Sequence, residues 1–327
     1  MKVLLICHES LIPPEKCAEL TAESKPWRTE FFISQALLRL GHDVQICGLS
    51  SELAPLKFAI KKIKPDIVFN LLEEFANETL LEFFVVNFLD DLKIPYTGCS
   101  AESLILCKNK ILTKSLLASK NVPVPRNNVF PKIVKYNFEE SSYGITDESI
   151  VIDLRQEEKL KKKLLKNYSW SHEGAVLAEE YIDGKELHVA AIPDYNVRNN
   201  YKFFEVWETQ FGTKKGPRMM TEKMKWNFKW RAGLSARLVK ARGLSSADKQ
   251  KIQHLSLIAL RTLSVDGPVR LDFRWNKSRG PVLIEVNPNP DLAKWDEYSA
   301  AAKSSGVKYD LLVQHILDLG IYRHSMT

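Results

Sequence analysis

The chain has 327 residues, of which 45% are hydrophobic, so it can bury a sizeable core and is long enough for two or three domains. Its opening apolar run is too short for a signal peptide, and no stretch approaches the roughly 18 apolar residues of a membrane-spanning helix. The formal net charge of +7 would suit either nucleic acid or a pocket for polyphosphate, so charge does not separate these partners. These features predict a soluble, cytoplasmic protein that does not contact a membrane.

The cysteines are odd in number and show no CxxC spacing. They are Cys7, Cys17, Cys47, Cys99 and Cys107. Neither a disulfide framework nor a structural zinc site is indicated, so we expect reduced thiols.

The N-terminal part of the chain alternates between apolar, strand-like runs and amphipathic, helical stretches. The predicted strands are residues 2–7, 43–47 and 66–71, and the predicted helices are residues 29–40 and 54–62. This order is typical of a doubly wound α/β domain with a parallel sheet, whose strands are buried on both faces. We therefore predict such a domain over residues 1–98.

After this domain the pattern changes to a mixed order of helices and strands. We predict helices at residues 109–119, 156–168, 246–263 and 308–319, and strands at residues 132–135, 176–181, 186–192, 269–275 and 281–286. Ser246 is the expected N-cap of the third of these helices. Residues 194–242 combine aromatics and cations without clear periodicity, so we expect strands joined by a long mobile loop there.

Four polar side chains occupy matching positions on the last two predicted strands. Side chains alternate along a strand, so Arg270 shares one face with Asp272, and Glu285 shares one face with Asn287. A hairpin would bring the four together. Carboxylate and amide oxygens suit Mg²⁺, and the arginine adds a fixed cation for a developing oxyanion. The alternative is the polar outer face of an ordinary hairpin, but the register and the closing Asn-Pro-Asn-Pro run favour a magnesium-nucleotide site.

Six short motifs, taken in their order along the chain, resemble the ATP-grasp enzymes and specifically the D-alanine-D-alanine ligase-like branch. They are residues 94–98 (IPYTG), Lys110 with Thr113 and Lys114, and residues 133–135 (IVK), 177–186 (LAEEYIDGKE), 270–273 (RLDF) and 285–290 (EVNPNP). The resemblance extends from Asp66 to the end of the chain. It implies that the α/β domain is followed by a two-lobed ATP-grasp fold of α+β character, with a central lobe over residues 99–173 and a C-terminal lobe over residues 174–327.

The resemblance assigns several residues to ATP. In the family two lysines contact the nucleotide phosphates, and they correspond here to Lys110 and Lys135, with Lys108 as the weaker alternative to Lys110. Lys110 could equally be an exposed helix lysine, whereas Lys135 lies in an apolar strand. The remaining implied contacts are the serines of a phosphate-covering loop, an adenine-binding strand end and a ribose-binding carboxylate: Ser141, Ser142, Glu179, the backbone at Tyr181 and Ile182, and Glu186.

The resemblance further implies an ATP-dependent ligase that joins a carboxylate to an amine through an acyl phosphate. Asp272, Glu285 and Asn287 would hold one or two Mg²⁺ ions, for which Mn²⁺ could substitute. Arg270 would stabilise the oxyanions. The implied partners are small molecules, an amino-acid or peptide carboxylate and an amine. The family leans towards dimers, so a homodimer is one candidate assembly.

Residues 214–231 interleave cations and aromatics, a pattern that is typical of single-stranded nucleic-acid platforms. The resemblance offers a second account, a mobile lid in which Lys225, followed by Trp226, closes over the γ-phosphate. We favour the lid, because basic-aromatic stretches are common and specific readings of them are often false positives. Lys225 therefore joins Arg270 as a predicted catalytic residue, and nucleic acid is not an expected partner.

Three features depart from the family pattern. Glu140 stands where the phosphate-covering loop has a glycine, and Asp291 stands where the ligases have a glycine whose amide helps bind the tetrahedral intermediate. Residues 70–78 lack the histidine and the glycines of authentic D-alanine-D-alanine ligases. Glu30 could replace the family's amine-binding glutamate, although the preference of helix starts for acidic residues also explains it. An authentic D-alanine-D-alanine ligase and an ATP-binding protein without ligase activity stay open as alternatives.

Overall fold

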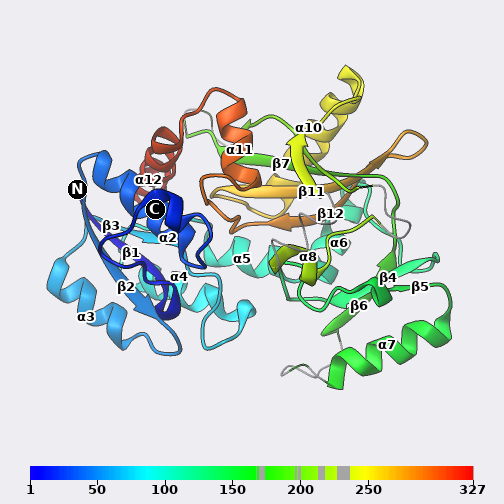
Figure 1. The fold of residues 1–327 in the computed structure, drawn as a ribbon, viewed down its shortest axis with the longest axis horizontal. Helices are drawn as coiled ribbons and strands as arrows, with labels where there is room; N and C mark the ends of the chain where they lie inside the picture. The colour runs from blue at the N-terminus through cyan, green and yellow to red at the C-terminus, as the bar shows by residue number, and fades with distance from the viewer. Residues whose placement is uncertain are drawn as a thin grey trace.

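A three-stranded parallel sheet begins the chain in the computed structural model, in the order β2-β1-β3 (Figure 1). Its strands are β1 (Lys2–His8), β2 (Asp43–Leu49) and β3 (Ile67–Asn70). Side chains alternate between its faces, so Val3 and Leu5 pack on one side and Leu4 and Ile6 on the other. The structure describes residues 1–166, 168, 174–195, 197, 200–212, 218–226 and 236–326.

Helices cover both faces of this sheet. They are α2 (Arg28–Arg39), α3 (Ala54–Ile63), α4 (Glu82–Asp91) and α12 (Tyr309–Ser325). The short helix α1 (Glu19–Ala22) packs on α2, and 3₁₀ turns lie at Glu9–Leu11 and Thr79–Leu81. The helices α2 and α12 cover one face, and α3 and α4 cover the other. The predicted doubly wound parallel sheet is therefore confirmed. The C-terminal helix returns to the first sheet, and both ends of the chain lie beside it in Figure 1.

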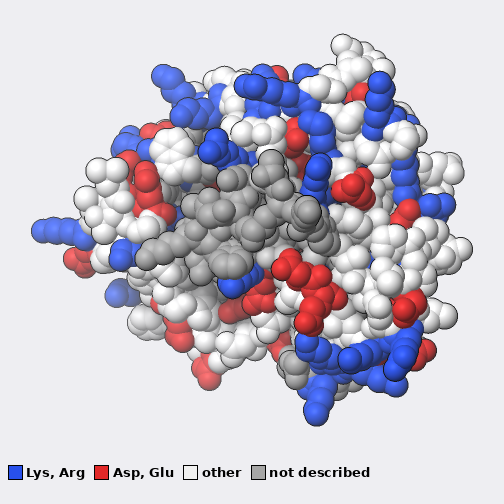
Figure 2. All heavy atoms as spheres, turned by 45° about the vertical axis from the view of Figure 1, so that its right-hand side comes forward, with Lys and Arg blue, Asp and Glu red and all other residues white. Residues whose placement is uncertain are grey.

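A small antiparallel sheet, in the order β5-β4-β6, carries a long helix on one face. This region contains α5 (Ala101–Lys108), α6 (Lys110–Ser119), β4 (Lys132–Tyr136), a 3₁₀ turn at Asp147–Ser149, β5 (Ile150–Val151), α7 (Leu154–Lys166) and β6 (Val176–Glu180). Val134 of β4 packs with Leu164 of α7. The outer face of α7 exposes lysines, which Figure 2 shows as a row of basic side chains along the lower edge. This is the solvated face of an amphipathic helix.

The largest sheet follows the order β10-β9-β7-β11-β12, and β8 pairs with β7. Its elements and their neighbours are β7 (Lys185–Pro193), β8 (Tyr201–Phe203), β9 (Trp207–Gln210), α8 (Glu222–Trp226), β10 (Arg237–Lys240), α10 (Ser246–Thr262), β11 (Val269–Asn276), β12 (Gly280–Asn287) and α11 (Glu297–Ser304). Leu187, Leu271 and Leu283 of the central strands share a core with α10. The two sheets that follow the first one are therefore both antiparallel, and their assignment to the two predicted lobes stays a prediction.

Some local features differ from the expectation. The N-cap of α10 is Ser245, because its side chain accepts from the Asp248 N–H while the Asp248 carboxylate accepts from the Ser245 N–H. Ser246 is instead the first residue of the helix. The mobile loop expected within residues 194–242 falls partly on 213–217 and 227–235, which lie outside the described residues. Within the described ranges, no helix is both long and apolar enough to cross a membrane.

Candidate active site

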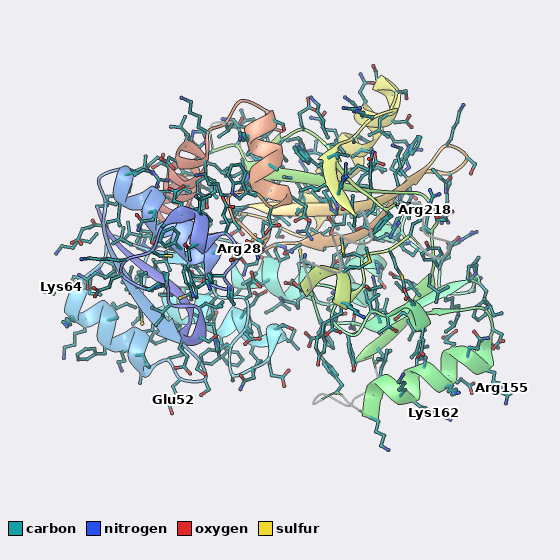
Figure 3. All side chains as sticks on the ribbon, in the orientation of Figure 1. Arg28, Glu52, Lys64, Arg155, Lys162 and Arg218 are labelled. Atoms are coloured by element: carbon teal, nitrogen blue, oxygen red, sulfur yellow. The ribbon has the colours of Figure 1, made fainter. Side chains whose placement is uncertain are left out.

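A cavity of about 530 Å³ lies where the first domain, the small sheet and the large sheet meet. Its walls come from α2, from the chain after β3, from β4 and the loop that follows it, from α8, and from β7, β11 and β12. In Figure 3, Arg28 of α2 lies at the boundary between the first domain and the rest of the molecule. The cavity therefore gathers residues that are far apart in the sequence.

The β11–β12 hairpin forms one wall of this cavity. Asp272 lies directly opposite Glu285 in its register, and Arg270 lies opposite Asn287. The hairpin prediction for these four residues is confirmed, while their binding roles stay a prediction. No three His, Cys, Asp or Glu side chains of the described chain are grouped so as to hold a metal ion by themselves. Mg²⁺ in nucleotide sites takes much of its shell from phosphate and water, so a pair of carboxylates is an ordinary protein contribution.

Asp272 is held by neighbours from two strands. Arg270 donates to it from Nε to Oδ1 at 2.9 Å and from Nη2 to Oδ2 at 3.0 Å. His188 of β7 contacts Oδ1 through Nδ1 at 2.8 Å, and its Nε2 lies 2.8 Å from Thr209 Oγ1. Burial would raise the pKa of Asp272, but the charges of Arg270 and His188 outweigh burial and hold that pKa well below its usual range. Asp272 is therefore ionised, as a metal ligand must be.

Two buried lysines lie near Glu285. Lys110 Nζ is 3.1 Å from Glu285 Oε1 and donates to the backbone oxygen of Glu139 at 2.5 Å. Because Lys110 is only 5% exposed, the alternative of an exposed helix lysine is wrong. Lys135 lines the cavity, and its Nζ lies 2.9 Å from Glu179 Oε1. Burial would raise the pKa of Glu285, but Lys110 and Lys135 together lower it.

Lys108, the alternative to Lys110, contacts the loop after β4, which the resemblance predicts to cover the phosphates. Its side chain is almost fully buried, and its Nζ is 3.0 Å from Glu82 Oε1 and 3.0 Å from Glu140 Oε1. Glu140 is the carboxylate that stands where the family pattern has a glycine. Lys108 therefore offsets part of the charge of Glu140 and reduces the conflict expected with a nearby phosphate, although the same lysine also pairs with Glu82.

The loop itself presents Ser141 and Ser142 to the cavity. Both adopt left-handed backbone conformations, with φ of 55° and 61°. Such conformations are uncommon for residues other than glycine and tend to occur at ligand-binding sites. The Gly144 N–H then donates to Glu222 Oε2 of α8 at 2.8 Å. The loop is therefore joined to α8, the helix that carries Lys225.

Lys225 lines the cavity near the first turn of α11. Burial would raise the pKa of Glu297, the first residue of α11, but Lys225 and then Arg270 lower it to about 2. Arg270 Nη1 lies 3.8 Å from Glu297 Oε2. The predicted lid lysine is thus close to the predicted oxyanion arginine, whereas part of residues 214–231 lies outside the described residues.

The predicted ribose and adenine contacts are divided between the cavity and its surroundings. Glu186 lines the cavity, and Arg274 Nη2 donates to its Oε2 at 2.6 Å. Tyr181 and Ile182 follow β6 and are not among the residues that line the cavity. The Tyr181 hydroxyl instead accepts from the Arg218 N–H at 3.0 Å.

Glu179 is buried behind the cavity wall. Lys135 contacts one of its oxygens, and Lys114 contacts the other. Burial, and then the neighbouring Lys135, lower the pKa of Lys114 to about 8, although Glu179 opposes this shift. Glu179 therefore links two cations, one of which reaches the cavity.

Residues 106–318 match the sequence model of a family described as the D-ala D-ala ligase C-terminus. The chain belongs to this family. The expected ATP-grasp membership is confirmed, and the protein is an ATP-dependent ligase of the D-alanine-D-alanine ligase type.

Relatives match the ligase over most of its length. An uncharacterized protein of Sinorhizobium fredii, y4sG, is 26% identical, with 92% of this chain and 90% of that protein covered. A D-alanine–D-alanine ligase of Xanthobacter autotrophicus is 27% identical, with 78% of this chain and 81% of that protein covered. The D-alanine–D-alanine ligase of Bacillus anthracis in complex with ATP has a TM-score of 0.73 at 18% identity, with 100% of this chain and 98% of that chain covered. At this identity the structural likeness shows a shared fold.

Several residues that line the cavity of the ligase were not predicted. His188, Thr209 and Arg274 are among them. Two of these could have been predicted, because side chains two positions apart on a strand share a face. His188 follows Glu186 by two positions on β7, and Arg274 follows Asp272 by two positions on β11.

Asp291 faces the first domain of the ligase. Arg28 Nη2 lies 2.9 Å from Asp291 Oδ2, and Thr29 Oγ1 donates to Asp291 Oδ1 at 2.7 Å. Glu30, the next residue of α2, is buried and lines the same cavity. The preference of helix starts for acidic residues is therefore not the only explanation for Glu30, because its side chain also lines the cavity. These contacts join residues more than 260 positions apart, so no local pattern could predict them.

Proposed function

We propose that this ligase joins the carboxylate of an amino-acid-like or small peptide substrate to an amine, through an acyl phosphate formed with ATP. The observation that carries the proposal is the pair of carboxylates Asp272 and Glu285 on adjacent strands, with buried lysines beside them in one cavity. Polyphosphate binding calls for fixed cations as well as a divalent metal. This combination supports phosphoryl transfer from a nucleotide.

The side chains at the hairpin fit Mg²⁺ or Mn²⁺. Asp272 and Glu285 would supply carboxylate oxygens, and Asn287 would supply an amide oxygen. One or two bound ions would neutralise phosphate charge. In the nucleotide site, Glu186 would hold the ribose and Glu179 would accept from the adenine amine.

The chain's own side chains would act by position and charge. Lys110, Lys135 and the loop serines would bind phosphate oxygens, and Lys225 would close over the γ-phosphate. A carboxylate oxygen of the substrate attacks that phosphorus, the bond from phosphorus to the bridging oxygen of ATP breaks, and ADP leaves. The neutral amine then attacks the acyl carbon and gives up a proton. The carbon–nitrogen bond forms, the bond from carbon to the phosphate oxygen breaks, and inorganic phosphate leaves. Arg270 would stabilise the oxyanion of the addition step.

A phosphate-release screen of amino acids and dipeptides with Mg-ATP tests the proposal. We expect release only when a carboxylate donor and an amine acceptor are both present. The double substitution Asp272→Ala with Glu285→Ala should lower kcat/KM by about 100-fold or more, because the removed charges act on the transferred phosphate. Glu52→Ala, an exposed position in the first domain (Figure 3), is the control and should keep the activity. Full activity in the double variant would overturn the site assignment.

The relatives named D-alanine–D-alanine ligase favour one second candidate, the synthesis of a D-alanine dipeptide. Its test is phosphate release with D-alanine as the only substrate. The departures at Asp291 and at residues 70–78 count against it. ATP binding without phosphate release from any donor and acceptor pair would instead support a binding protein without ligase activity.

A further inference from the structure

A second cavity, of about 790 Å³, lies beside the small sheet and shares no lining residue with the first cavity. Its walls come from α6, from residues 121–128, from α7 and from β6. Pockets for small molecules have volumes of about 300–1,000 Å³. The second cavity is therefore large enough to hold a small molecule that is separate from the nucleotide.

Among the described residues, positive charge exceeds negative charge around the second cavity. Three buried carboxylates in or beside its wall each pair with two cations. The pairs are Glu157 with Lys132 and Lys161, Glu179 with Lys114 and Lys135, and Glu180 with Arg126 and Arg279. Three of these cations and two of these carboxylates line the cavity itself. The surrounding charges would therefore attract an anion that enters it.

Lys114 is the most deeply buried of the three lining cations, with a side chain 11% exposed. Burial disfavours its charged form, and the charges of Lys135 and Lys110 do so as well. Together they lower the pKa of Lys114 to about 8, although Glu179 opposes the shift. Glu179 compensates Lys114 only in part, because the same carboxylate also pairs with Lys135. A negatively charged ligand would supply the missing compensation.

The open edge of β6 adds hydrogen-bonding groups to the second cavity. This strand is the last of the small sheet and pairs with β4 on one side only. The Glu180 N–H points away from β4, since it donates to the Arg126 backbone oxygen at 2.8 Å. Backbone groups alternate in direction along a strand, so the N–H and C=O of Ala178, which lines the cavity, point the same way. No hydrogen bond joins either group to a described residue on that side of the strand.

Much of the remaining wall is apolar. It includes Val122, Pro123, Val124, Pro125 and Val176. The two prolines have no N–H, so they leave fewer backbone groups in this wall to be satisfied. The second cavity therefore suits a ligand that combines a negative charge, an amide group for the strand edge and an apolar side chain.

Glu179 connects the second cavity to the first. It lines the second cavity, and Lys135, which lies 2.9 Å from its Oε1, lines the first. Lys114 contacts its other oxygen. A ligand that draws Lys114 into the second cavity would leave this oxygen free to accept from the adenine amine, which is the role proposed for Glu179. Occupancy of the second cavity would therefore change the nucleotide affinity of the first.

We propose that the second cavity binds a small carboxylate that also carries an amide group, such as an N-acyl amino acid, and that this ligand strengthens nucleotide binding in the first cavity. The carboxylate pairs with Lys114 and Lys161, the amide pairs with the edge of β6, and the apolar part packs on Val122 and Val124. The effect on the nucleotide rests on the proposed function, because it uses the adenine site, whereas binding in the second cavity does not.

Titration calorimetry with N-acetylleucine tests the binding without turnover. N-acetylleucinamide has the same body but no negative charge, and 4-methylpentanoate has the charge but no amide. We expect N-acetylleucine to bind at least about 10-fold more tightly than N-acetylleucinamide, since hydrogen bonds to charged groups in a buried site are strong. It should also bind more tightly than 4-methylpentanoate. Equal affinities for N-acetylleucine and N-acetylleucinamide would overturn the anion site, and equal affinities for N-acetylleucine and 4-methylpentanoate would overturn the contact with β6.

Two neighbouring lysines of α7 show whether the ligand lies in the second cavity. Lys161→Met removes a lining cation and leaves Glu157 paired with Lys132, so it should weaken N-acetylleucine binding by about 5-fold. A thermal melt would show that the variant folds. Lys162→Met is the matched control, because Lys162 is exposed on the same helix (Figure 3) and does not line the cavity. An equal effect of the two substitutions, whether a loss or none, would contradict binding in this cavity.

The effect on the nucleotide is measured as the affinity for Mg-ADP with and without saturating N-acetylleucine. We expect the ligand to tighten Mg-ADP binding by about 5-fold. Weaker Mg-ADP binding would show that the two compounds compete for the first cavity, and it would overturn the inference. An unchanged affinity would keep the anion site and overturn its effect on the nucleotide. Absence of Mg-ADP binding under all conditions would overturn the proposed function and leave the result for the second cavity standing.

Discussion

At the scale of single residues, Lys108 is the buried cation that two carboxylates share beside the loop after β4. It lies 3.0 Å from both Glu82 and Glu140, and its side chain is almost fully buried. Lys108→Met would leave two carboxylates without their cation, and we expect it to lower the free energy of unfolding by about 3–5 kcal/mol. Urea denaturation would measure this loss.

A matched lysine on the surface provides the control. Lys163 pairs with Glu148 at 3.2 Å, but both side chains are mostly exposed. Lys163→Met should change the free energy of unfolding by less than about 0.5 kcal/mol. Adding Glu140→Gln to Lys108→Met should restore part of the lost stability. Equal losses of stability in Lys108→Met and Lys163→Met would contradict the idea that burial makes the Lys108 ion pairs more important for stability than a surface pair.

The buried carboxyl group of Glu30 should make the free energy of unfolding depend on pH when no substrate is bound. Burial raises its pKa to about 7 in the folded protein, whereas an unfolded chain releases this proton near its ordinary pKa of about 4.5. Between these values the folded state binds more protons, so the contribution of Glu30 makes stability fall as the pH rises from about 4.5 to 7. Above that range the contribution is constant.

Glu30→Gln removes this titration. Its stability relative to the natural chain should therefore increase from pH 5 to pH 8, as measured by urea denaturation at both values. The same comparison with Glu52→Gln, at an exposed position, should show no such trend. A constant difference between Glu30→Gln and the natural chain at the two pH values would contradict the raised pKa.

At the scale of elements, the hairpin could be predicted because its signal is local. The period of two along β11 and β12 places Asp272 opposite Glu285, and the register in the structure agrees. The helices α1, α4, α5, α8 and α11 were not predicted. Most residues of α4 are apolar, so its helical period is weak, and α11 is built largely from small residues that give little contrast.

Residues of the candidate site could be predicted from the sequence only where they belong to a short motif or to the alternating pattern of a strand. Asp272, Glu285 and Lys135 fall on such patterns. The contact of Arg28 with Asp291 depends on how α2 meets the chain after β12, and no periodicity within either segment carries that information. The pairing of Lys108 with Glu140 likewise appears only when α5 and the loop after β4 come together.

At the scale of the whole molecule, the first and last parts of the chain share one core. Val3, Leu5 and Phe69 of the first sheet belong to the same buried cluster as Val313 and Ile316 of α12. The division at residues 98 and 173 and the homodimer stay predictions. Whatever the boundaries, the shared cluster links the stability of the first sheet to the C-terminal helix.

This shared core predicts the effect of a cavity in α12. Ile316 is 2% exposed, and Ile316→Ala should lower the free energy of unfolding by about 2–5 kcal/mol through lost burial and an unfilled space. Leu311→Ala, on the same helix but 49% exposed, should change it by less than about 0.5 kcal/mol. Urea denaturation, followed by tryptophan fluorescence and circular dichroism, would measure both. Because residues from both ends of the chain fill this core, loss of α12 packing should also expose the first sheet. An Ile316→Ala variant that lost only α12, with the first sheet as resistant to urea as before, would contradict this coupling.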